Sequence, residues 1–338
     1  MANLDLSRVL SNLALSELEA EGLMNEIMEG NLSPVATSAI LTALRVRGET
    51  VPEIVGFARG MRAKAVRVPV VSNGVLVDVV GTGGDGANTF NISTTAAFVV
   101  ATAGVAVAKH GNRSASSKAG SADVLEALGV NLEQTPERVA EAVRSVGVGF
   151  MFARNHHPAM RHVAPVRAEL RVRTVFNLLG PLTNPAGASH SLIGVYDAKL
   201  VRPIAEVLHG LGSRAAMVVN GSGLDELTVC GPSNVAELRD GTVREYTLEP
   251  EQLGLGLFET SSLAGGDPSE NAIITREILA GRGSSAQRDV TALNAGAALF
   301  TAGATTTLEA GVQRALEVLN SGLGLGTLEA YARFTQQS

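Results

Sequence analysis

The segment VLVDVVGTGGDGANTFNIST, residues 75–94, joins a β-branched apolar run to a glycine-rich turn. The run at 75–80 predicts a short buried strand. The turn GTGGDG (81–86) matches the G-x-G-x-x-G spacing of a dinucleotide-binding loop. Glycines at such a turn expose successive backbone N–H groups, and a following helix adds a partial positive charge. The segment therefore predicts an anion site, and most simply a phosphate site, at the end of a strand.

The sequence after the turn argues against a nicotinamide cofactor. A Rossmann loop expects an acidic residue about 20 positions later, to bind a ribose hydroxyl. The first acidic residue after Asp85 is Asp123, and the expected region holds VAVAKHG (105–111), which carries a lysine instead. A Walker-type loop is also excluded, because no Gly-Lys-Ser/Thr follows. A tight turn without a ligand stays open as an alternative.

Predicted strands and helices alternate on the C-terminal side of this turn. Further strands are expected at 105–111, 148–153, 191–196 and 215–221, with helices at 93–104, 121–129, 136–147 and 200–212. Such alternation predicts βαβ units and a largely parallel sheet. The segment TVREYTL (242–248) is expected to be an antiparallel addition, and late helices are expected around 292–303 and 307–322.

Short helices and no strand are expected before residue 65. Ser16 with Glu19 and Thr50 with Glu53 have the spacing of a capping box. Ser33 is followed by a proline, which suits the first helical position after an N-cap. A chain of 338 residues is long enough for two domains.

Composition excludes several classes of protein. The formal net charge of −6 argues against broad binding of nucleic acid. No uninterrupted run of about 18 apolar residues occurs, so we expect no membrane-spanning helix. The N-terminus lacks the basic-then-apolar pattern of a signal peptide, so we expect a cytoplasmic protein. Cys230 is the only cysteine, which rules out an intrachain disulfide and argues against a cysteine-based zinc site.

A second polar loop, within KHGNRSASSKAGSADVLEALG (109–129), follows the next predicted strand. Its lysines, arginine, serine hydroxyls and backbone N–H groups can surround a phosphate. Parallel sheets bind ligands at the carboxyl ends of their strands, where this loop begins. Two such loops on successive strands predict one ligand with two separated phosphate groups. A solvated loop is the alternative.

Acidic and basic side chains complete the set of candidates. Asp225 and Glu226 follow the predicted strand at 215–221, and beside a polyphosphate they would be natural Mg²⁺ ligands. A solvated surface pair is the alternative. The stretch 154–185 carries five arginines: Arg154, Arg161, Arg167, Arg171 and Arg173. A guanidinium directed into a pocket suits a carboxylate, because its planar fork can bond both oxygens.

Four segments together closely resemble the motif set of the anthranilate phosphoribosyltransferases: GTGGDGANTFNIST (81–94), KHGNRSASSKAGSADVLEALG (109–129), NLLGPLTNP (177–185) and DELT (225–228). They occur in the expected order, and the resemblance covers essentially the whole chain. It implies a class III, nucleoside-phosphorylase-like enzyme that joins anthranilate to 5-phosphoribosyl 1-diphosphate (PRPP) and releases diphosphate, in tryptophan biosynthesis. It also implies Mg²⁺ as cofactor and a homodimer as the assembly.

The resemblance implies an α/β fold class, with a small helical domain and a larger α/β domain around a mostly parallel central sheet. The helical domain would comprise residues 1–71, joined by a central segment at about 165–188. The α/β domain, which would bind PRPP, would comprise residues 72–164 and 189–338. The active site would lie in the cleft between the two domains.

The resemblance also implies which residues form the site. The PRPP-binding residues would be Gly81, Gly84, Asp85, Thr89, Asn91, Ile92, Ser93, Thr94, Lys109, His110, Gly111, Asn112, Arg113, Ser114, Ala115, Ser116, Ser117 and Ser121. The anthranilate-binding residues would be Gly81, Asn112 and Arg167, with Arg167 on the substrate carboxylate and with His110, His157 and Gly180 nearby. The metal ligands would be Ser93, Asp225 and Glu226.

No acid or base is assigned, because neither a Ser-His-Asp triad nor a catalytic cysteine is recognisable. Catalysis is therefore expected to come from positioning and electrostatics. Three rival functions stay open at this stage. They are a pyrimidine nucleoside phosphorylase of the same fold, a catalytically silent paralogue that binds nucleic acid, and, as the weakest, a dehydrogenase.

Overall fold

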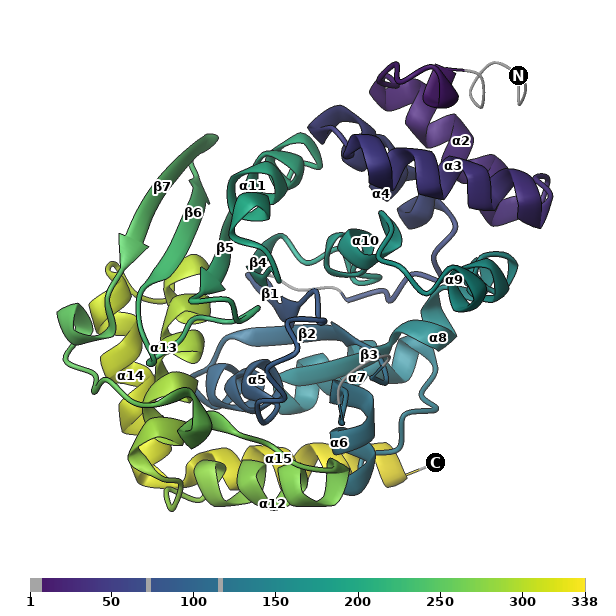
Figure 1. Ribbon diagram of the computed structural model, residues 1–338. Coiled ribbons are helices and arrows are strands. Elements are labelled where there is room, and N and C mark those ends of the chain that lie inside the picture. The colour runs from purple at the N-terminus through teal and green to yellow at the C-terminus, as the bar shows by residue number, and fades with distance from the viewer. Residues whose placement is uncertain (1–7, 71–73, 115–117, 338) are drawn as a thin grey trace.

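The computed structural model describes residues 8–70, 74–114 and 118–337, and one seven-stranded sheet lies at its centre (Figure 1). The strand order is β3-β2-β1-β4-β5-β6-β7. The strands are β1 (Leu76–Gly81), β2 (Ala106–Gly111), β3 (Val148–Phe152), β4 (His190–Gly194), β5 (Ala215–Gly221), β6 (Ser233–Arg239) and β7 (Thr242–Leu248).

The first five strands run parallel, and the last two are antiparallel. The prediction of a mostly parallel sheet is confirmed, as is the antiparallel addition at 242–248. Strand β6 was not predicted, because its sequence SNVAELR has no clear period of two. Pairing with β5 along its whole length is what makes it a strand. The parallel order brings the carboxyl ends of β2, β1, β4 and β5 to one edge of the sheet.

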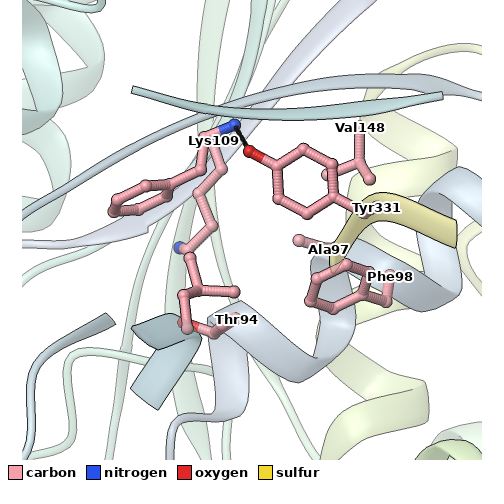
Figure 2. Close-up of a pocket in the computed structure, with 8 residues that line it drawn as sticks. Thr94, Ala97, Phe98, Lys109, Val148 and Tyr331 are labelled. Atoms are coloured by element: carbon pink, nitrogen blue, oxygen red, sulfur yellow. Dashed lines mark hydrogen bonds between the residues drawn. The ribbon is translucent and has the colours of Figure 1, made fainter. Parts of the chain in front are cut away.

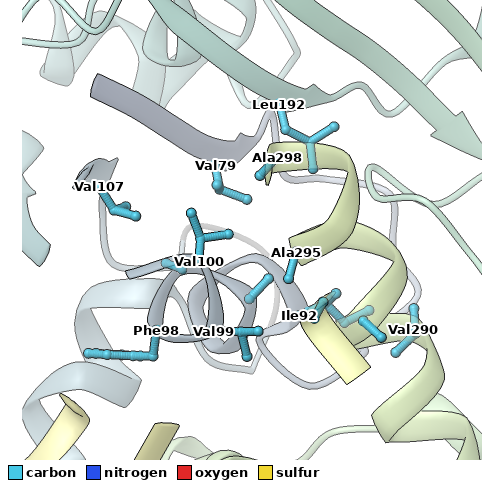
Figure 3. Close-up of a cluster of buried hydrophobic side chains, with 14 of the residues drawn as sticks. Val79, Ile92, Phe98, Val99, Val100, Val107, Leu192, Val290, Ala295 and Ala298 are labelled. Carbon is cyan, nitrogen blue, oxygen red and sulfur yellow. The ribbon is translucent and has the colours of Figure 1, made fainter. Parts of the chain in front are cut away.

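One face of the sheet is covered by α5 (Ile92–Thr102) and by a layer of C-terminal helices (Figure 1). Figure 3 shows how closely they pack: Val79 of β1, Val100 of α5 and Ala298 of α13 meet in one cluster. Because α5 is apolar on all sides, burial rather than intrinsic helix propensity holds it in place. The C-terminal helices are α12 (Pro268–Leu279), α13 (Ser285–Thr301), α14 (Leu308–Ser321) and α15 (Leu323–Gln336).

The other face contacts a second group of helices, which forms its own buried cluster with the sheet. This group includes α2 (Glu17–Glu29), α3 (Pro34–Arg47), α4 (Val51–Ala63), α9 (Ala164–Leu170), α10 (Phe176–Leu182) and α11 (Val201–Gly210). The predicted capping boxes at Ser16 and Thr50 are both present, and Ser33 caps α3. Residues 8–65 contain no strand, as predicted.

Helix α7 (Pro136–Val146) packs against β3 and β2. The shorter elements are α6 (Ser121–Ala127), α8 (Ala153–His156), η1 (Pro158–His162), η2 (Ala198–Leu200), η3 (Pro250–Leu253) and η4 (Thr260–Leu263). None of the helices within the described ranges combines the length and apolar character needed to cross a bilayer.

Candidate active site at the carboxyl ends of the strands

The glycine turn leaves β1 at Gly81 and reaches α5 only at Ile92. Gly83, Gly84 and Gly86 have φ angles of +69°, +83° and +78°, which side chains rarely adopt. The backbone N–H of Gly83 donates to Asp225 Oδ2 at 2.6 Å. The turn therefore already binds an anionic group, a carboxylate of its own chain.

Asp225 and Glu226 follow β5 and lie beside this turn. The Glu226 Oε1 atom accepts a hydrogen bond of 3.0 Å from the backbone N–H of Ser93, in the first turn of α5. Burial, followed by repulsion from Asp85, raises the pKa of Asp225 to about 7. Burial and the neighbouring Asp225 raise the pKa of Glu226 to about 8. Acids that repel one another in a buried site make a place where a cation would be stabilised.

The donor atoms at this place fit Mg²⁺. The two carboxylates and the Ser93 hydroxyl are hard oxygen donors, the kind that Mg²⁺ prefers. Within the described residues, no three His, Cys, Asp or Glu side chains form a ready-made metal site. This agrees with the usual coordination of Mg²⁺ in proteins, which involves only one or two carboxylates, with waters or substrate phosphates as the other ligands.

Lys109 of β2 is buried at 4% exposure and supplies positive charge next to the acids. Its Nζ atom donates to the Val79 carbonyl and, at 3.3 Å, to Ser93 Oγ. Burial lowers the pKa of Lys109, while the carboxylates of Asp78 and Glu226 oppose that shift. The predicted phosphate-binding lysine thus lies under the turn and points at the candidate metal ligand.

The second predicted loop is only partly described, since Ala115, Ser116 and Ser117 lie outside the described residues. Arg113 forms ion pairs of 2.9 Å with both Asp123 and Glu126, so its charge is offset by two carboxylates. The Ser121 hydroxyl donates to the Asn112 carbonyl at 3.3 Å, and the Ser114 N–H donates to Asp123 Oδ2. This loop therefore folds back onto the start of α6.

Two histidines form a buried contact near this loop. The rings of His110 and His157 have centroids 5.1 Å apart. The Nδ1 atom of His110 lies 3.1 Å from the Gly180 carbonyl, whereas its buried Nε2 has no hydrogen-bond partner among the described residues. Burial, with repulsion from His157, lowers the pKa of His110 to about 3. Both rings are therefore neutral near pH 7.

Arg167 lies on α9, with its guanidinium 5.7 Å from the centre of the Phe176 ring. Burial lowers its pKa, and no carboxylate of the described chain forms an ion pair with it. No hydrogen bond in the described part of the chain joins Arg167 to Gly81 or Asn112. The structure thus leaves Arg167 a partly buried cation without an ion-pair partner in the described chain.

The remaining predicted residues lie around the start of α5. The Asn91 side chain donates to the Ala119 carbonyl and accepts from Asn271, and Thr89 forms an isolated bridge with Ala264. The Ile92 side chain belongs to the hydrophobic core, so only its backbone can face a ligand. The buried Thr94 hydroxyl has no partner within the described residues.

A buried network of hydrogen bonds lies beneath the site and was not predicted from the sequence. Asp78, 1% exposed on β1, accepts from the His110 backbone N–H at 3.2 Å and from the Asn184 side chain at 2.7 Å. Asn184 also donates to the Ala108 carbonyl at 2.8 Å. Burial raises the pKa of Asp78 to about 6, opposed by the charge of Lys109. A carboxylate inside the apolar run VLVDVV was the available signal.

The enclosed space near the site is too small for a substrate. A cavity of about 10 Å³ lies between Thr94 and Phe98 of α5, Lys109 of β2 and Tyr331 of α15. Figure 2 shows these side chains around it. A volume of this size holds at most a single water. The dashed line marks the hydrogen bond of 2.8 Å from the Phe150 N–H to the Tyr331 hydroxyl. This cavity is therefore not a substrate site.

Comparisons with known proteins agree on one family. Residues 6–65 match the helical bundle domain of a glycosyl transferase family, and residues 73–325 match its a/b domain. The anthranilate phosphoribosyltransferase of Deinococcus radiodurans is 56% identical over 98% of both chains. That of Rubrobacter xylanophilus is 57% identical over 96% of this chain and 94% of its own.

Solved structures agree with these relatives. The crystal structure of anthranilate phosphoribosyltransferase from Thermus thermophilus has a TM-score of 0.94 and 50% identity, covering 98% of this chain and 99% of its own. The Saccharomyces cerevisiae enzyme in complex with PRPP and Mg has a TM-score of 0.89 and 27% identity, covering 99% of this chain and 98% of its own.

Proposed function

The chain belongs to the anthranilate phosphoribosyltransferase family, and we propose that the groups gathered at the carboxyl ends of β1, β2 and β5 carry out the reaction of that family. Its activity is the transfer of the 5-phosphoribosyl group from PRPP to the anthranilate amine, with release of diphosphate, as in tryptophan biosynthesis. The observation that carries the proposal is the convergence of the glycine turn, Ser93 and the acidic pair Asp225 and Glu226 at one sheet edge.

PRPP would bind across the two loops, with its diphosphate at the turn and the start of α5. We propose that it is held by the PRPP-binding residues predicted from the sequence, which lie within the segments 81–94 and 109–121. Buried Lys109 adds a positive charge beside Ser93. Loss of diphosphate leaves positive charge on the ribose, so N–H donors and cations aimed at the departing anion lower the barrier.

Mg²⁺ would be held by Ser93, Asp225 and Glu226, and when bound it supplies charge that stabilises the departing diphosphate. The high pKa values of the two acids support this assignment, because a cation would relieve the repulsion that raises them. The Gly83 N–H, which donates to Asp225 here, would be free to turn to the substrate if Asp225 bound the metal.

Anthranilate would bind on the side of Arg167, with Gly81 and Asn112 nearby. The guanidinium of Arg167 has no ion-pair partner in the described chain and suits the carboxylate of this substrate. The rings of His110 and His157, which are neutral near pH 7, would offer an uncharged wall to the aromatic ring of the substrate. The aniline nitrogen is a neutral nucleophile, so the reaction requires orientation more than a general base.

The domain division predicted from the sequence is also part of this proposal. Helices α3 and α4 contact α9 and α10 of the central segment, which supports grouping residues 165–188 with residues 1–71. The rest, 72–164 and 189–338, would form the α/β domain, with the substrates in the cleft between the two. A cytoplasmic location, without nucleic-acid or membrane partners, is proposed on the same family grounds.

A homodimer is proposed as the assembly. Large apolar side chains are exposed in the N-terminal helices, with Leu18 at 79%, Val35 at 79% and Val46 at 82% exposure. Burying them against a second copy would remove apolar surface from water. Light scattering on the purified protein is expected to give twice the monomer mass of 34.9 kDa, and Val46→Glu to shift it toward the monomer.

One assay tests the function directly. Protein mixed with PRPP, Mg²⁺ and anthranilate is expected to consume anthranilate, followed as loss of its fluorescence, only when all three are present. Phosphorolysis of a pyrimidine nucleoside in place of this transfer would assign the chain to the rival phosphorylase reaction.

A further inference from the structure

Arg173, between α9 and α10, reaches across to the glycine turn. Its guanidinium carbon lies 4.0 Å from the centre of the Tyr196 ring, and one of its terminal nitrogens donates to the Gly84 carbonyl. The described part of the chain gives this guanidinium no carboxylate partner. A planar cation stacked on an aromatic face is held in orientation as well as in place.

Tyr196 is itself attached to the same turn. Its backbone N–H donates to Thr82 Oγ1 at 3.1 Å, and the Thr82 N–H donates to the Gly194 carbonyl at 2.9 Å. The ring on which Arg173 stacks therefore belongs to a segment that is already fixed to the turn. Arg173 and Tyr196 close a small circuit of contacts around residues 82–84.

The geometry of the peptide group explains what this circuit can do. In a planar trans peptide the carbonyl and the following N–H point in opposite directions. Because the Gly84 carbonyl faces Arg173, the N–H of Asp85 faces away from it. Glycine allows this peptide group to rotate at little cost, as the φ of +83° at Gly84 illustrates, so a bond from outside the turn is needed to select one orientation.

We propose that Arg173 is a positioning residue for phosphoribosyl transfer: stacked on Tyr196, it holds the Gly84 carbonyl and so turns the N–H groups of the glycine loop toward the diphosphate of PRPP. This inference rests on the proposed function and deepens it. Arg173 lies in the segment that links the helices α9 and α10, so it also ties the position of that segment to the conformation of the substrate loop.

The test compares Arg173→Met, Arg173→Lys, Tyr196→Leu and the double variant Arg173→Met/Tyr196→Leu with the unaltered protein. Arg161→Met is the matched control, because Arg161 is an exposed arginine of the same basic stretch. Steady-state kinetics give kcat and KM for each substrate, and calorimetry gives the affinity for PRPP with Mg²⁺. Loss of a charge-assisted hydrogen bond predicts a change of roughly tenfold.

Arg173→Met and Tyr196→Leu are each expected to raise the KM for PRPP about tenfold, with the KM for anthranilate within about twofold. The double variant is expected to be no worse than either single one, since both break the same circuit. Arg173→Lys is expected to restore only part of the loss, because an ammonium cannot stack flat. Should Arg173→Met fail to fold, Tyr196→Leu and Arg173→Lys carry the same comparison.

Two results would overturn the inference. One is an unchanged KM for PRPP in Tyr196→Leu together with full recovery in Arg173→Lys, which would make Arg173 a direct phosphate ligand through its charge. The other is an Arg173→Met protein that behaves like Arg161→Met. If the unaltered protein binds PRPP but transfers nothing to anthranilate, the proposed function fails, while the PRPP affinities of the variants still decide the role of Arg173.

Discussion

The Gly83 N–H donates to Asp225 Oδ2 at 2.6 Å and so joins the loop after β1 to the loop after β5, across 142 positions of the chain. This approach is possible because two strand-end residues lack side chains. A Cβ on Gly81 would lie 2.3 Å from Asp225 Oδ2, and one on Gly194 would lie 1.6 Å from the Asp225 carbonyl oxygen. The acidic pair is thus placed by glycines on two neighbouring strands.

Gly194→Ala is expected to displace Asp225 and to weaken both folding and Mg²⁺ binding. The added methyl meets backbone, which cannot move aside as a flexible side chain can, so a loss of about 1–3 kcal/mol in the free energy of unfolding is expected. Urea denaturation measures this loss. The control is Gly22→Ala in α2, where nothing lies within 4 Å and a small gain in stability is expected. Equal midpoints for the two variants would contradict this picture.

Asp225→Asn combined with Glu226→Gln is expected to have opposite effects on activity and stability. Turnover should require at least roughly tenfold more Mg²⁺, because two hard anionic ligands are lost. Without metal at pH 8 the variant should unfold at a higher temperature, since buried acids that repel each other become neutral. Exposed Glu309→Gln serves as the control. An unaltered Mg²⁺ titration would remove the pair from the metal site.

Arg167→Ala is expected to raise the KM for anthranilate much more than the KM for PRPP. The guanidinium has no ion-pair partner in the described chain, so its removal should change the stability of the fold little. The carboxylate of the substrate, by contrast, would lose its charged partner. A loss of roughly ten- to hundredfold in kcat/KM for anthranilate corresponds to one charge-assisted contact. Exposed Arg154→Ala provides the comparison. Equal effects on both substrates would argue against the assigned role.

Acidification is expected to destabilise the protein through its buried histidines. The pKa of His157 is lowered to about 4, chiefly by burial and then by repulsion from His156, and that of His110 to about 3. Unfolded histidine takes up its proton near pH 6.5, so the unfolded chain binds more protons between about pH 6 and 4. The stability that the folded protein gains from keeping His110 and His157 neutral is therefore fully present above about pH 6.5 and is lost as the pH falls.

Within that window, each histidine should make the free energy of unfolding fall by about 1.4 kcal/mol for each unit by which the pH is lowered. His157→Phe, which cannot titrate, should make the slope shallower by about this amount in denaturation curves from pH 7 to 4.5. His209→Gln, at an exposed position, is the matched control. Identical pH dependence of the unfolding free energy in His157→Phe and the unaltered protein would contradict this. It would show that the ring takes up its proton in the folded protein as readily as in the unfolded chain.

Tyr331→Phe is expected to cost about 1–3 kcal/mol of stability, although Tyr331 lies far along the chain from the site. Its hydroxyl accepts from the Phe150 N–H of strand β3, and phenylalanine would leave that buried donor without a partner. Tyr246→Phe should cost less, since Tyr246 is only partly buried. Guanidinium denaturation compares the two, and the reverse order would show that water reaches Phe150.

The sequence by itself determined the strand–turn–helix segment at 75–104, the caps of the N-terminal helices, the largely parallel sheet and the motifs of the family. These features depend on residues within a few positions of one another, on hydrophobic period and on the unusual φ angles of glycine. The acidic pair Asp225 and Glu226 was recognisable for the same reason, since it stands in the short loop after the predicted strand at 215–221.

Only the tertiary structure decided which groups meet. The Arg173–Gly84 hydrogen bond spans 89 positions, and the Asn184–Asp78 bond spans 106. Strand β6 became a strand through its pairing with β5, and Lys109 proved to be buried beneath Ser93. Contacts of this kind depend on strand order, register and the packing of distant helices. A local pattern carries no information about them, because it depends on neighbours in the chain and not on neighbours in space.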